Sequence, residues 1–284
     1  MSARGIAFRE PKRQMTLPNQ STRMNQSPPP FAWPDGRRAA VSLSWDDARV
    51  SQVDIGIPVL NEFDVRGSFY VMPNLVEQRL EQWRSAVTRG HEIGNHTINH
   101  PSGGNFIWQR PEYMLETYTL ERIEQEIEDA SQRLEKLLGK RPTTFAYCAG
   151  QTFVGRGREV KSFVPIIARR FLIGRTYFLP TYNIPSRCDR AQINGVGIDN
   201  LSFDQVRSFI DAAVNGGGWA VLVGHEMGNP KDRLNTSMDV LRQVCDYLKS
   251  RPEIWVDTVA AVGEHFNRHL GEDQRWHGEE ISSS

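Results

Sequence analysis

The chain has 284 residues, and its 34 Lys and Arg residues balance its 34 Asp and Glu residues. This balance excludes the basic surface with which nucleic-acid-binding proteins neutralise phosphates, so we expect no nucleic-acid partner. No apolar run approaches the ~18 residues that cross a bilayer, so we expect no membrane association. The hydrophobic fraction of 39% suffices for a folded core, and the length suits one α/β barrel with tails.

Both ends of the sequence differ in composition from its middle. Residues 1–36 are rich in Arg, Gln, Asn, Ser and Pro, which predicts an irregular N-terminal tail. This tail is charged and has no apolar segment typical of a secretory signal, so we expect a cytoplasmic protein. Residues 271–284 are charged and Ser-rich, which predicts a C-terminal tail after a domain spanning 37–270. Three widely spaced cysteines indicate free thiols: Cys148, Cys188 and Cys245.

Between the tails, short apolar runs alternate with helical stretches. In chain order, strand patterns lie at 41–45, 68–71, 144–147, 172–177, 193–198, 220–223 and 254–256. Helical patterns lie at 58–63, 75–88, 114–138, 203–214, 238–249 and 259–270. Roughly seven β-then-α units predict parallel strands with crossover helices, which leaves an α/β barrel or a doubly wound sheet.

An acidic pair follows the first strand pattern. In such folds, catalytic groups lie at the C-terminal ends of strands, which is where Asp46 and Asp47 stand. Successive side chains of a strand point to opposite faces, so both carboxylates can share one site only where the strand ends and the backbone turns. The alternative is an ordinary turn or helix cap, for which Asp is equally suited.

Two histidines form the next polar cluster. His96 and His100 follow the run Gly-His-Glu-Ile-Gly-Asn at 90–95. At this spacing, two imidazoles lie on one side of a helical turn and can reach one divalent ion. An incidental pair of polar side chains is the alternative. His91, within the preceding run, is interpreted as mainly structural.

A third element is a buried strand pattern that ends at His225. One interpretation of this residue is a polar strand terminus; the other is a proton donor to a leaving group, since an imidazole titrates near neutrality. One Asp and two His would form a metal site with open positions, whereas a closed structural zinc site would need a fourth protein ligand.

With these motifs, the sequence resembles the polysaccharide deacetylases, carbohydrate esterase family 4, over about residues 39–266. Ser44-Trp45-Asp46-Asp47-Ala48 is similar to the family's Thr-Phe-Asp-Asp-Gly motif, and His96-Thr97-Ile98-Asn99-His100 meets its His-Ser/Thr-x-x-His motif. The resemblance implies a distorted (β/α)7 barrel in which Asp47, His96 and His100 hold one divalent ion. Zn²⁺ is the expected ion, with Co²⁺, Mn²⁺ or Ni²⁺ as alternatives. The resemblance also implies that Asp46 is the general base and His225 the general acid.

The later motifs depart from the family pattern. Where the family has Arg-x-Pro-Tyr, this chain reads Ala146-Tyr147-Cys148-Ala149, so the arginine that holds the base is absent and another group must orient Asp46. The resemblance implies the backbone N–H of Ala149 as the oxyanion donor, because a backbone donor does not depend on the side chain. It also implies Asp199 as the support of His225, although the local match is loose. Cys148 is interpreted as a small buried hydrophobe.

These features predict a metal-dependent hydrolase that removes acetyl groups from an N- or O-acetylated carbohydrate. The altered third motif and the expected cytoplasmic location keep a small amide or cyclic ureide open as the substrate, as in allantoinase-like and imidase-like relatives. A carbohydrate-binding pseudoenzyme is a third hypothesis, against which the intact ligands, base and acid argue. Aromatic residues in 102–118 form either a sugar-stacking wall or ordinary packing. Hydrophobic C-terminal segments leave a homo-oligomer open.

Overall fold

The computed structural model describes residues 31–228 and 233–278. Two units divide the chain at Pro30, and the second unit, Phe31–Ser284, contains every described residue. The predicted N-terminal tail lies outside the described residues up to position 30, and so does the C-terminal tail from position 279.

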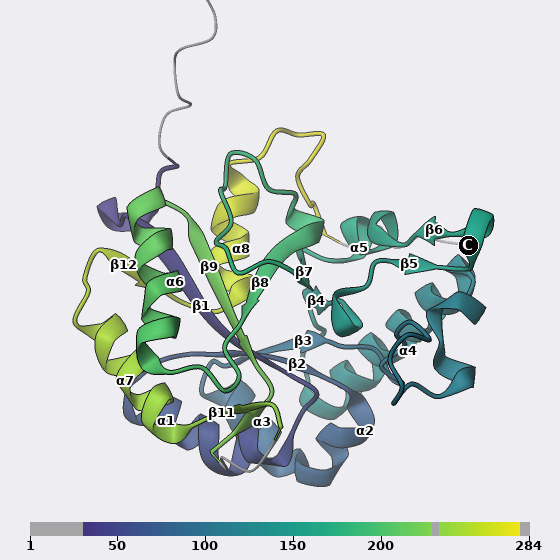
Figure 1. The fold of residues 1–284 in the computed structure, drawn as a ribbon, viewed down its shortest axis with the longest axis horizontal. Coiled ribbons are helices and arrows are strands. Elements are labelled where there is room, and N and C mark those ends of the chain that lie inside the picture. The colour runs from purple at the N-terminus through teal and green to yellow at the C-terminus, as the bar shows by residue number, and fades with distance from the viewer. Residues whose placement is uncertain (1–30, 229–232, 279–284) are drawn as a thin grey trace, which may run out of the picture. The chain divides into compact units, whose positions relative to one another are not determined.

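Parallel strands form a closed barrel, which Figure 1 shows with helices around it. The eight-stranded sheet runs in the order β12, β1, β2, β3, β4, β7, β8, β9, and β9 pairs again with β1, so seven strands close the ring. The strands are β1 (Ala39–Asp46), β2 (Ser68–Val71), β3 (Glu92–Asn95), β4 (Thr144–Ala146), β7 (Ile173–Tyr177), β8 (Ile193–Gly197), β9 (Trp219–Gly224) and β12 (Ile254–Val256). This closure confirms the predicted (β/α)7 barrel and excludes the doubly wound sheet.

The eighth strand, β12, lies beside the first half of β1. It pairs with Ala39–Val41, whereas β2 pairs with Ser44–Asp46. Strand β9 pairs with the other edge of β1 along most of its length, so β12 and β2 share one edge. On this edge, β12 pairs with the beginning of β1 and β2 with its end. The barrel is therefore distorted between β1 and β2.

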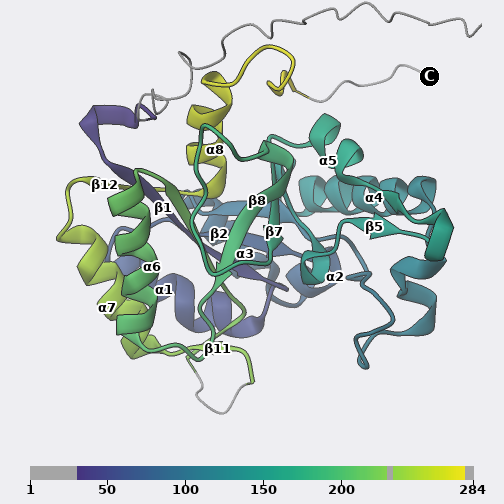
Figure 2. The ribbon, with the colours of Figure 1, turned by 45° about the horizontal axis from the view of Figure 1, so that its top comes forward.

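The helices lie on the outside and at one end of the barrel. Figure 2 shows α1, α6 and α7 on one flank and α4 and α5 on the other. Their bounds are α1 (Ile57–Glu62), α2 (Pro73–Val76), α3 (Leu80–Thr88), α4 (Leu120–Leu138), α5 (Val164–Arg170), α6 (Phe203–Gly216), α7 (Met238–Lys249) and α8 (Val259–Arg268). Two small pairs complete the structure: β5 (Phe153–Val154) with β6 (Lys161–Ser162), and β10 (Glu226–Met227) with β11 (Asn235–Thr236).

Helix α8 covers the end of the barrel at which the strands begin. Its apolar residues Val259, Val262 and Phe266 share a core cluster with residues of β1, β7, β8 and β9. The N–H of Val259 donates to Ser68 Oγ at 2.8 Å, and the N–H of Ala260 donates to Glu92 Oε2 at 2.8 Å. Ser68 and Glu92 are the first residues of β2 and β3. Helix α8 therefore closes this end of the barrel, and a site can form only at the opposite end, where the strands finish.

The barrel interior is narrow and partly polar. A Cβ added at Gly94 would lie 2.4 Å from the ring of Tyr70, and one at Gly195 would lie 2.8 Å from Cδ of Arg175. Tyr70 and Arg175 are fully buried. Glycine at these two strand positions therefore makes room for a phenol and a guanidinium inside the ring.

Two predicted helices have different bounds. The 114–138 pattern becomes a helix only at Leu120, because Thr119 Oγ1 accepts from the N–H of Arg122 at 3.2 Å and residues 111–117 form two short 3₁₀ turns. The 75–88 pattern divides into α2, a 3₁₀ turn and α3, because Arg79 leaves the helical region at φ −141°. Hydrophobic periodicity does not register such local breaks.

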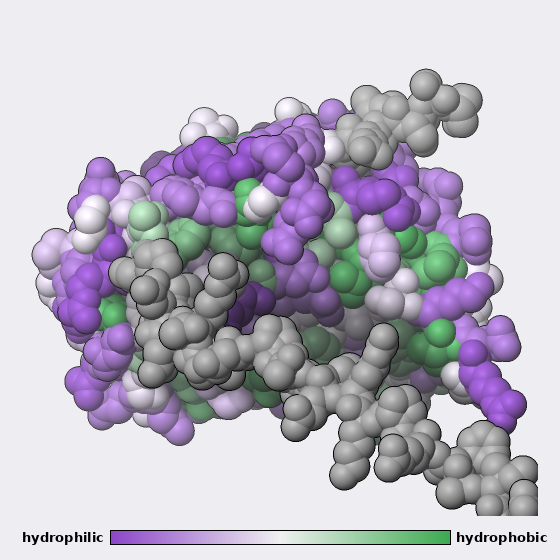
Figure 3. Space-filling model, turned by 90° about the horizontal axis from the view of Figure 1, so that it is seen from above, coloured by the Kyte–Doolittle hydropathy of each residue, from purple (hydrophilic) through white to green (hydrophobic). Residues whose placement is uncertain are grey.

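The described parts of both tails contact the barrel. Trp33 Nε1 donates to the carbonyl of Gly217 at 3.0 Å. Arg190 Nε donates to the carbonyl of Gln274 at 2.7 Å, and Asn267 Nδ2 donates to that of Trp276 at 2.8 Å. On the face shown in Figure 3, hydrophilic residues dominate and hydrophobic ones form smaller patches between them. Among the described helices, none has the length and apolar character that a bilayer crossing requires.

Candidate active site

The C-terminal strand ends surround a cleft of about 960 Å³. Its lining includes six of the seven residues that the sequence singled out: Asp46, Asp47, His96, His100, Ala149 and His225. The seventh, Asp199, lies behind His225. Five of the eight described non-glycine residues with positive φ lie in or next to this cleft: Asp47, Ala48, Thr97, His100 and Ala149. Such backbone strain concentrates at functional sites.

The backbone turn after β1 brings the two carboxylates together. Asp46 ends the strand, and Asp47 follows it with a left-handed φ of 77° while its N–H donates to the carbonyl of Tyr70 at 3.0 Å. Gln52 Nε2 donates to the carbonyls of Asp46 at 2.5 Å and His225 at 2.9 Å. This side chain, which the sequence did not single out, ties the ends of β1 and β9 together.

The histidine pair lies in a loop after β3, so the expected helical turn is wrong. Asn95 Oδ1 accepts from the N–H of Thr97 at 2.8 Å, and Thr97 Oγ1 accepts from the N–H of His100 at 3.0 Å. These side-chain caps bend the backbone through the left-handed positions of Thr97 and His100. The two rings still meet, with centroids 4.9 Å apart.

Three side chains have the donor set of a divalent-metal site. Asp47 Oδ1 lies 3.4 Å from His96 Nε2 and 3.7 Å from His100 Nε2. This oxygen is buried and has no hydrogen-bond donor among the described residues. His96 Nδ1 lies 2.9 Å from the carbonyl of Ala146 and must donate to it, which leaves the Nε2 lone pair directed toward Asp47. A buried carboxylate oxygen without a donor, facing two imidazole nitrogens, fits a zinc-type ion.

The charge states of two of these groups, Asp47 and His100, suit metal binding. Burial alone would raise the pKa of Asp47, but its contact with His96 and the charges of His100 and His225 hold that pKa well below its usual value. Burial, together with the charge of His96, lowers the pKa of His100 to about 4. Asp47 is therefore ionised and His100 neutral at neutral pH, which is the form in which each ligates a metal.

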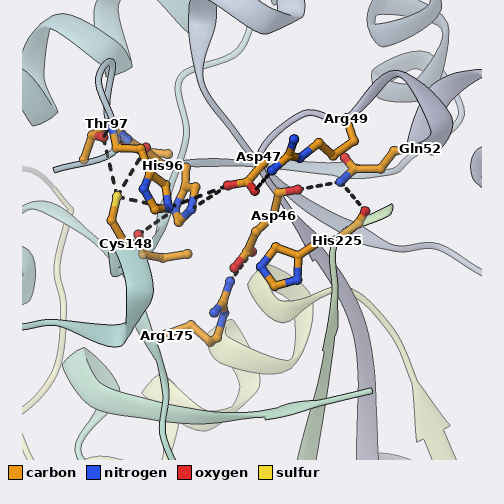
Figure 4. A network of polar contacts seen from close by, with 12 residues as sticks. Asp46, Asp47, Arg49, Gln52, His96, Thr97, Cys148, Arg175 and His225 are labelled. Atoms are coloured by element: carbon orange, nitrogen blue, oxygen red, sulfur yellow. Dashed lines mark hydrogen bonds and ion pairs between the residues drawn. The ribbon is translucent and has the colours of Figure 1, made fainter. Parts of the chain in front are cut away.

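Cys148 offers a second donor set with the same histidines. Ligand atoms of His96, His100 and Cys148 lie within 4.8 Å of one another. However, Cys148 Sγ approaches His96 at Nδ1, at 4.0 Å, and that nitrogen is already bonded to Ala146. Figure 4 shows Cys148 and Asp47 on opposite sides of His96. We therefore favour the Asp47 side, where both Nε2 atoms converge.

A buried arginine holds Asp46. Arg175, in the middle of β7, is fully buried and forms an ion pair through Nη2 with Asp46 Oδ1. Figure 4 shows the Asp46 carboxylate between this guanidinium and the ring of His225. Arg175 thus stands where a replacement for the absent third-motif arginine is needed. Its sequence signal is a lone cation in an otherwise uncharged strand, Ile173–Tyr177, since a buried arginine requires an anion.

His225 is oriented by Asp199. Its Nδ1 lies 2.6 Å from Asp199 Oδ2, and its backbone N–H donates to Asp199 Oδ1 at 3.1 Å. Burial would lower the pKa of His225, but the hydrogen bond to Asp199 and the charge of Asp46 outweigh it and raise the pKa above 6.5. With Nδ1 bonded to the carboxylate, Nε2 is the nitrogen left for proton transfer.

The third-motif loop contributes backbone to the cleft. Ala149 has a left-handed φ of 49° in the turn after β4. The hydrogen bonds of this turn use the N–H groups of Gly150 and Gln151, at 2.9 and 3.1 Å, and the N–H of Ala149 takes part in neither.

The aromatic residues of the segment 102–118 divide between the cleft and the core. Phe106 and Trp108 line the cleft, and the Trp108 ring lies 5.5 Å from that of His100. Tyr118 is buried and donates to Glu126 Oε2 at 2.7 Å. His91 lies away from the cleft, where its Nδ1 accepts from the N–H of Gly67 at 3.0 Å.

Part of the chain matches a family of known proteins. Residues 34–160 match the family model described as polysaccharide deacetylase. Among curated proteins, the chain is 24% identical over 243 residues to a gellan lyase from Bacillus sp and 24% identical over 110 residues to the uncharacterized protein YlxY of Bacillus subtilis strain 168. These alignments cover 79% and 39% of this chain but only 9% and 30% of the relatives.

Solved structures with the same fold include two that cover most of this chain. A protein assigned as a polysaccharide deacetylase from Mycobacterium smegmatis has a TM-score of 0.62 and 17% identity, covering 84% of this chain and 93% of its own. A family 4 acetyl xylan esterase from Clostridium thermocellum, in complex with a cobalt ion, has a TM-score of 0.52 and 20% identity, covering 80% and 91%. At these identities the likeness establishes the barrel.

The fold and the cleft thus define a (β/α)7 barrel with a polar site at its strand ends. Within it, the stretch that matches the polysaccharide deacetylase family model contains the Asp46-Asp47 and His96-His100 motifs.

Proposed function

We propose that the protein is a metal-dependent hydrolase that removes an acetyl or similarly small acyl group from an amine or alcohol. The family suggests an acetylated carbohydrate as the substrate class. The main support is one juxtaposition: Asp46 and His225 flank the cleft in which Asp47, His96 and His100 converge.

Asp47, His96 and His100 would hold one divalent ion, with Zn²⁺ first and Co²⁺, Mn²⁺ or Ni²⁺ as alternatives. Such an ion supplies Lewis acidity, which polarises an acyl carbonyl and makes a water molecule more acidic. The likeness to a fold relative crystallised with a cobalt ion agrees with this proposal. Cys148 remains outside the ligand set.

Asp46 acts as the general base. Its carboxylate lies in the cleft next to the Asp47 turn, and its ion pair with the guanidinium of Arg175 fixes its orientation. The carboxylate accepts a proton from the attacking water. Arg175 does not contact the substrate and is therefore a positioning residue.

Two other groups of the cleft stabilise the charge that develops on the substrate. The N–H of Ala149 donates to the oxyanion of the tetrahedral intermediate. His225 Nε2 donates a proton to the departing nitrogen or oxygen, and the raised pKa of this histidine favours the protonated ring that this step needs. Asp199 holds the ring in the required tautomer.

A second candidate substrate is a small non-sugar amide. One observation favours it: among the described residues that line the cleft, there is no Asn, Gln, Ser or Thr to pair with sugar hydroxyls. The metal ligands, base and acid would serve this substrate in the same way.

Two variants test the assigned roles. Asp46→Asn keeps the three ligands, so it should bind one ion per chain and lose at least a hundredfold in hydrolysis of 4-nitrophenyl acetate. His96→Ala removes a ligand and should lose the ion. Full activity in either variant would refute the proposed roles, and an inactive wild type with one ion bound would favour the pseudoenzyme.

A further inference from the structure

The chemistry of the cleft lining narrows the substrate beyond the acyl group. Apart from the reacting residues, the lining is made of apolar side chains, aromatic side chains and two arginines. A cleft of about 960 Å³ is in the range that encloses a small molecule. The part of the substrate next to its acyl group must therefore be compatible with apolar side chains and with the positive charge of the arginines.

A sugar ring fits this lining poorly. Each hydroxyl that leaves water needs a hydrogen-bond partner, and burying it without one is costly. The lining offers no neutral amide or hydroxyl side chain among the described residues except two tyrosines. Tyr147 already donates to the carbonyl of Ala191 at 2.9 Å. The hydroxyl of Tyr177 lies against Gly197, so closely that a Cβ added to this glycine would be 2.2 Å from it.

One wall of the cleft is apolar and open to solvent. Ile107 is fully exposed and Trp108 is 48% exposed, although both line the cleft with Leu75 and Leu234. Trp108 packs beside His100, at 5.5 Å between ring centroids. A ligand that covered these side chains would remove exposed apolar surface beside the reacting groups, which is favourable.

The cations of the cleft are not matched by its acids. Asp46 pairs with Arg175, and Asp47 pairs with Arg49 at 2.8 Å. Arg233 also lines the cleft, is exposed, and forms no ion pair with any described residue. It precedes Leu234, whose carbonyl accepts from the N–H of Glu226 at 2.8 Å, so it lies on the side of the cleft with His225, where the leaving group would receive its proton. A guanidinium there suits a carboxylate on the leaving group.

We propose that the substrate is an acylated amine or alcohol whose body is apolar and poor in hydroxyl groups and bears a carboxylate that Arg233 recognises. This inference rests on the proposed function and specifies the substrate class for the same site. It favours the small-amide candidate over a neutral sugar.

Binding to the full chain tests the inference without relying on turnover. The probes are 4-acetamidobenzoate, its neutral counterpart 4-acetamidobenzamide, and N-acetylglucosamine, titrated calorimetrically into EDTA-treated protein so that no carboxylate coordinates a metal. Wild type should bind the benzoate about fivefold more tightly than the benzamide, and both about tenfold more tightly than N-acetylglucosamine. Arg233→Gln should bring the two aromatic probes within about twofold of each other.

Two further variants separate the contributions. Arg158→Gln removes an exposed arginine outside the cleft and should keep the fivefold preference. Ile107→Ser should weaken the binding of both aromatic probes severalfold and to about the same extent. Equal binding of benzoate and benzamide to wild type, a preference that survives in Arg233→Gln, or equally tight binding of N-acetylglucosamine would overturn the inference.

Hydrolysis of 4-nitrophenyl acetate by zinc-loaded protein separates the two proposals. This small ester needs the base and the metal ligands but not Arg233. If the protein prefers the benzoate to the benzamide but does not hydrolyse the ester, the inference is supported and the proposed function is refuted. If it hydrolyses the ester without that preference, the proposed function is supported and the inference is refuted.

Discussion

The ion pair between Asp46 and Arg175 makes a demanding prediction, because both groups are buried inside the barrel. Arg175 is fully buried and Asp46 is 5% exposed. Arg175→Gln would leave the Asp46 carboxylate without its counter-charge. Removing one partner of a buried ion pair costs about 3–5 kcal/mol in the free energy of unfolding. For a chain of this size, that corresponds to a fall of roughly 6–20 °C in Tm.

The double variant distinguishes loss of charge from loss of packing. Asp46→Asn combined with Arg175→Gln removes both charges, so its destabilisation should be at least about 1 kcal/mol smaller than the sum of the single variants. The assay is urea denaturation of EDTA-treated protein, followed by the fluorescence of its 7 tryptophans. Arg242→Gln, which breaks the exposed pair with Glu62, is the matched control and should leave stability nearly unchanged.

If the destabilisation of the double variant equals the sum of those of the single variants, this account is refuted, because Asp46 and Arg175 then contribute independently to stability. The same variant should also affect catalysis. Without the guanidinium, the carboxylate of Asp46 is no longer held in place, so kcat of Arg175→Gln should fall while KM and zinc binding are kept. An unchanged kcat would contradict the assignment of Arg175 as the group that positions the base.

Three further predictions concern other parts of the structure. Asp199→Asn removes the carboxylate whose hydrogen bond and charge help to raise the pKa of His225 against burial, so the alkaline limb of kcat/KM should move to lower pH; an unchanged limb would exclude His225 as the acid. Cys148→Ala should still bind one zinc ion, as measured by atomic absorption, whereas Asp47→Ala should not; the reverse result would assign the site to the thiol side. Gly94→Ala forces a methyl group to within 2.4 Å of the Tyr70 ring and should cost about 1–3 kcal/mol in urea denaturation, and an unshifted midpoint would contradict the packed interior.

The strand order follows largely from the sequence, because apolar runs and helical patterns alternate through the chain. The runs at 68–71 and 254–256 match β2 and β12 without change, and 238–249 matches α7. The pattern did not reveal β3, since Glu92–Asn95 contains a charged residue and a glycine that serve interior contacts. Nor did it indicate that β12 lies outside the seven-stranded ring, because that depends on the register of β1.

The site was predictable where it follows from adjacent residues and less so where it depends on tertiary contacts. Asp46, Asp47, His96 and His100 stand in two short motifs. Arg175 comes from β7 and reaches Asp46 only in the closed barrel, and Gln52 reaches the carbonyl of His225 only when β1 and β9 pair. A lone arginine in a strand indicates a buried anion but does not identify it. The loop geometry of the histidine pair was also outside prediction, since it depends on the side-chain caps of Asn95 and Thr97.

The most direct test of the central claim is a zinc titration of metal-stripped protein, with acetate release followed at each step. The substrate panel contains 4-nitrophenyl acetate, N- and O-acetylated sugars and 4-acetamidobenzoate, with ring opening of a cyclic ureide run in parallel. We predict that hydrolysis of at least one substrate rises with zinc and saturates at one equivalent per chain in wild type, while Asp46→Asn takes up the same equivalent without turnover. Hydrolysis that is independent of added zinc, or equal rates in the two proteins, would contradict the account.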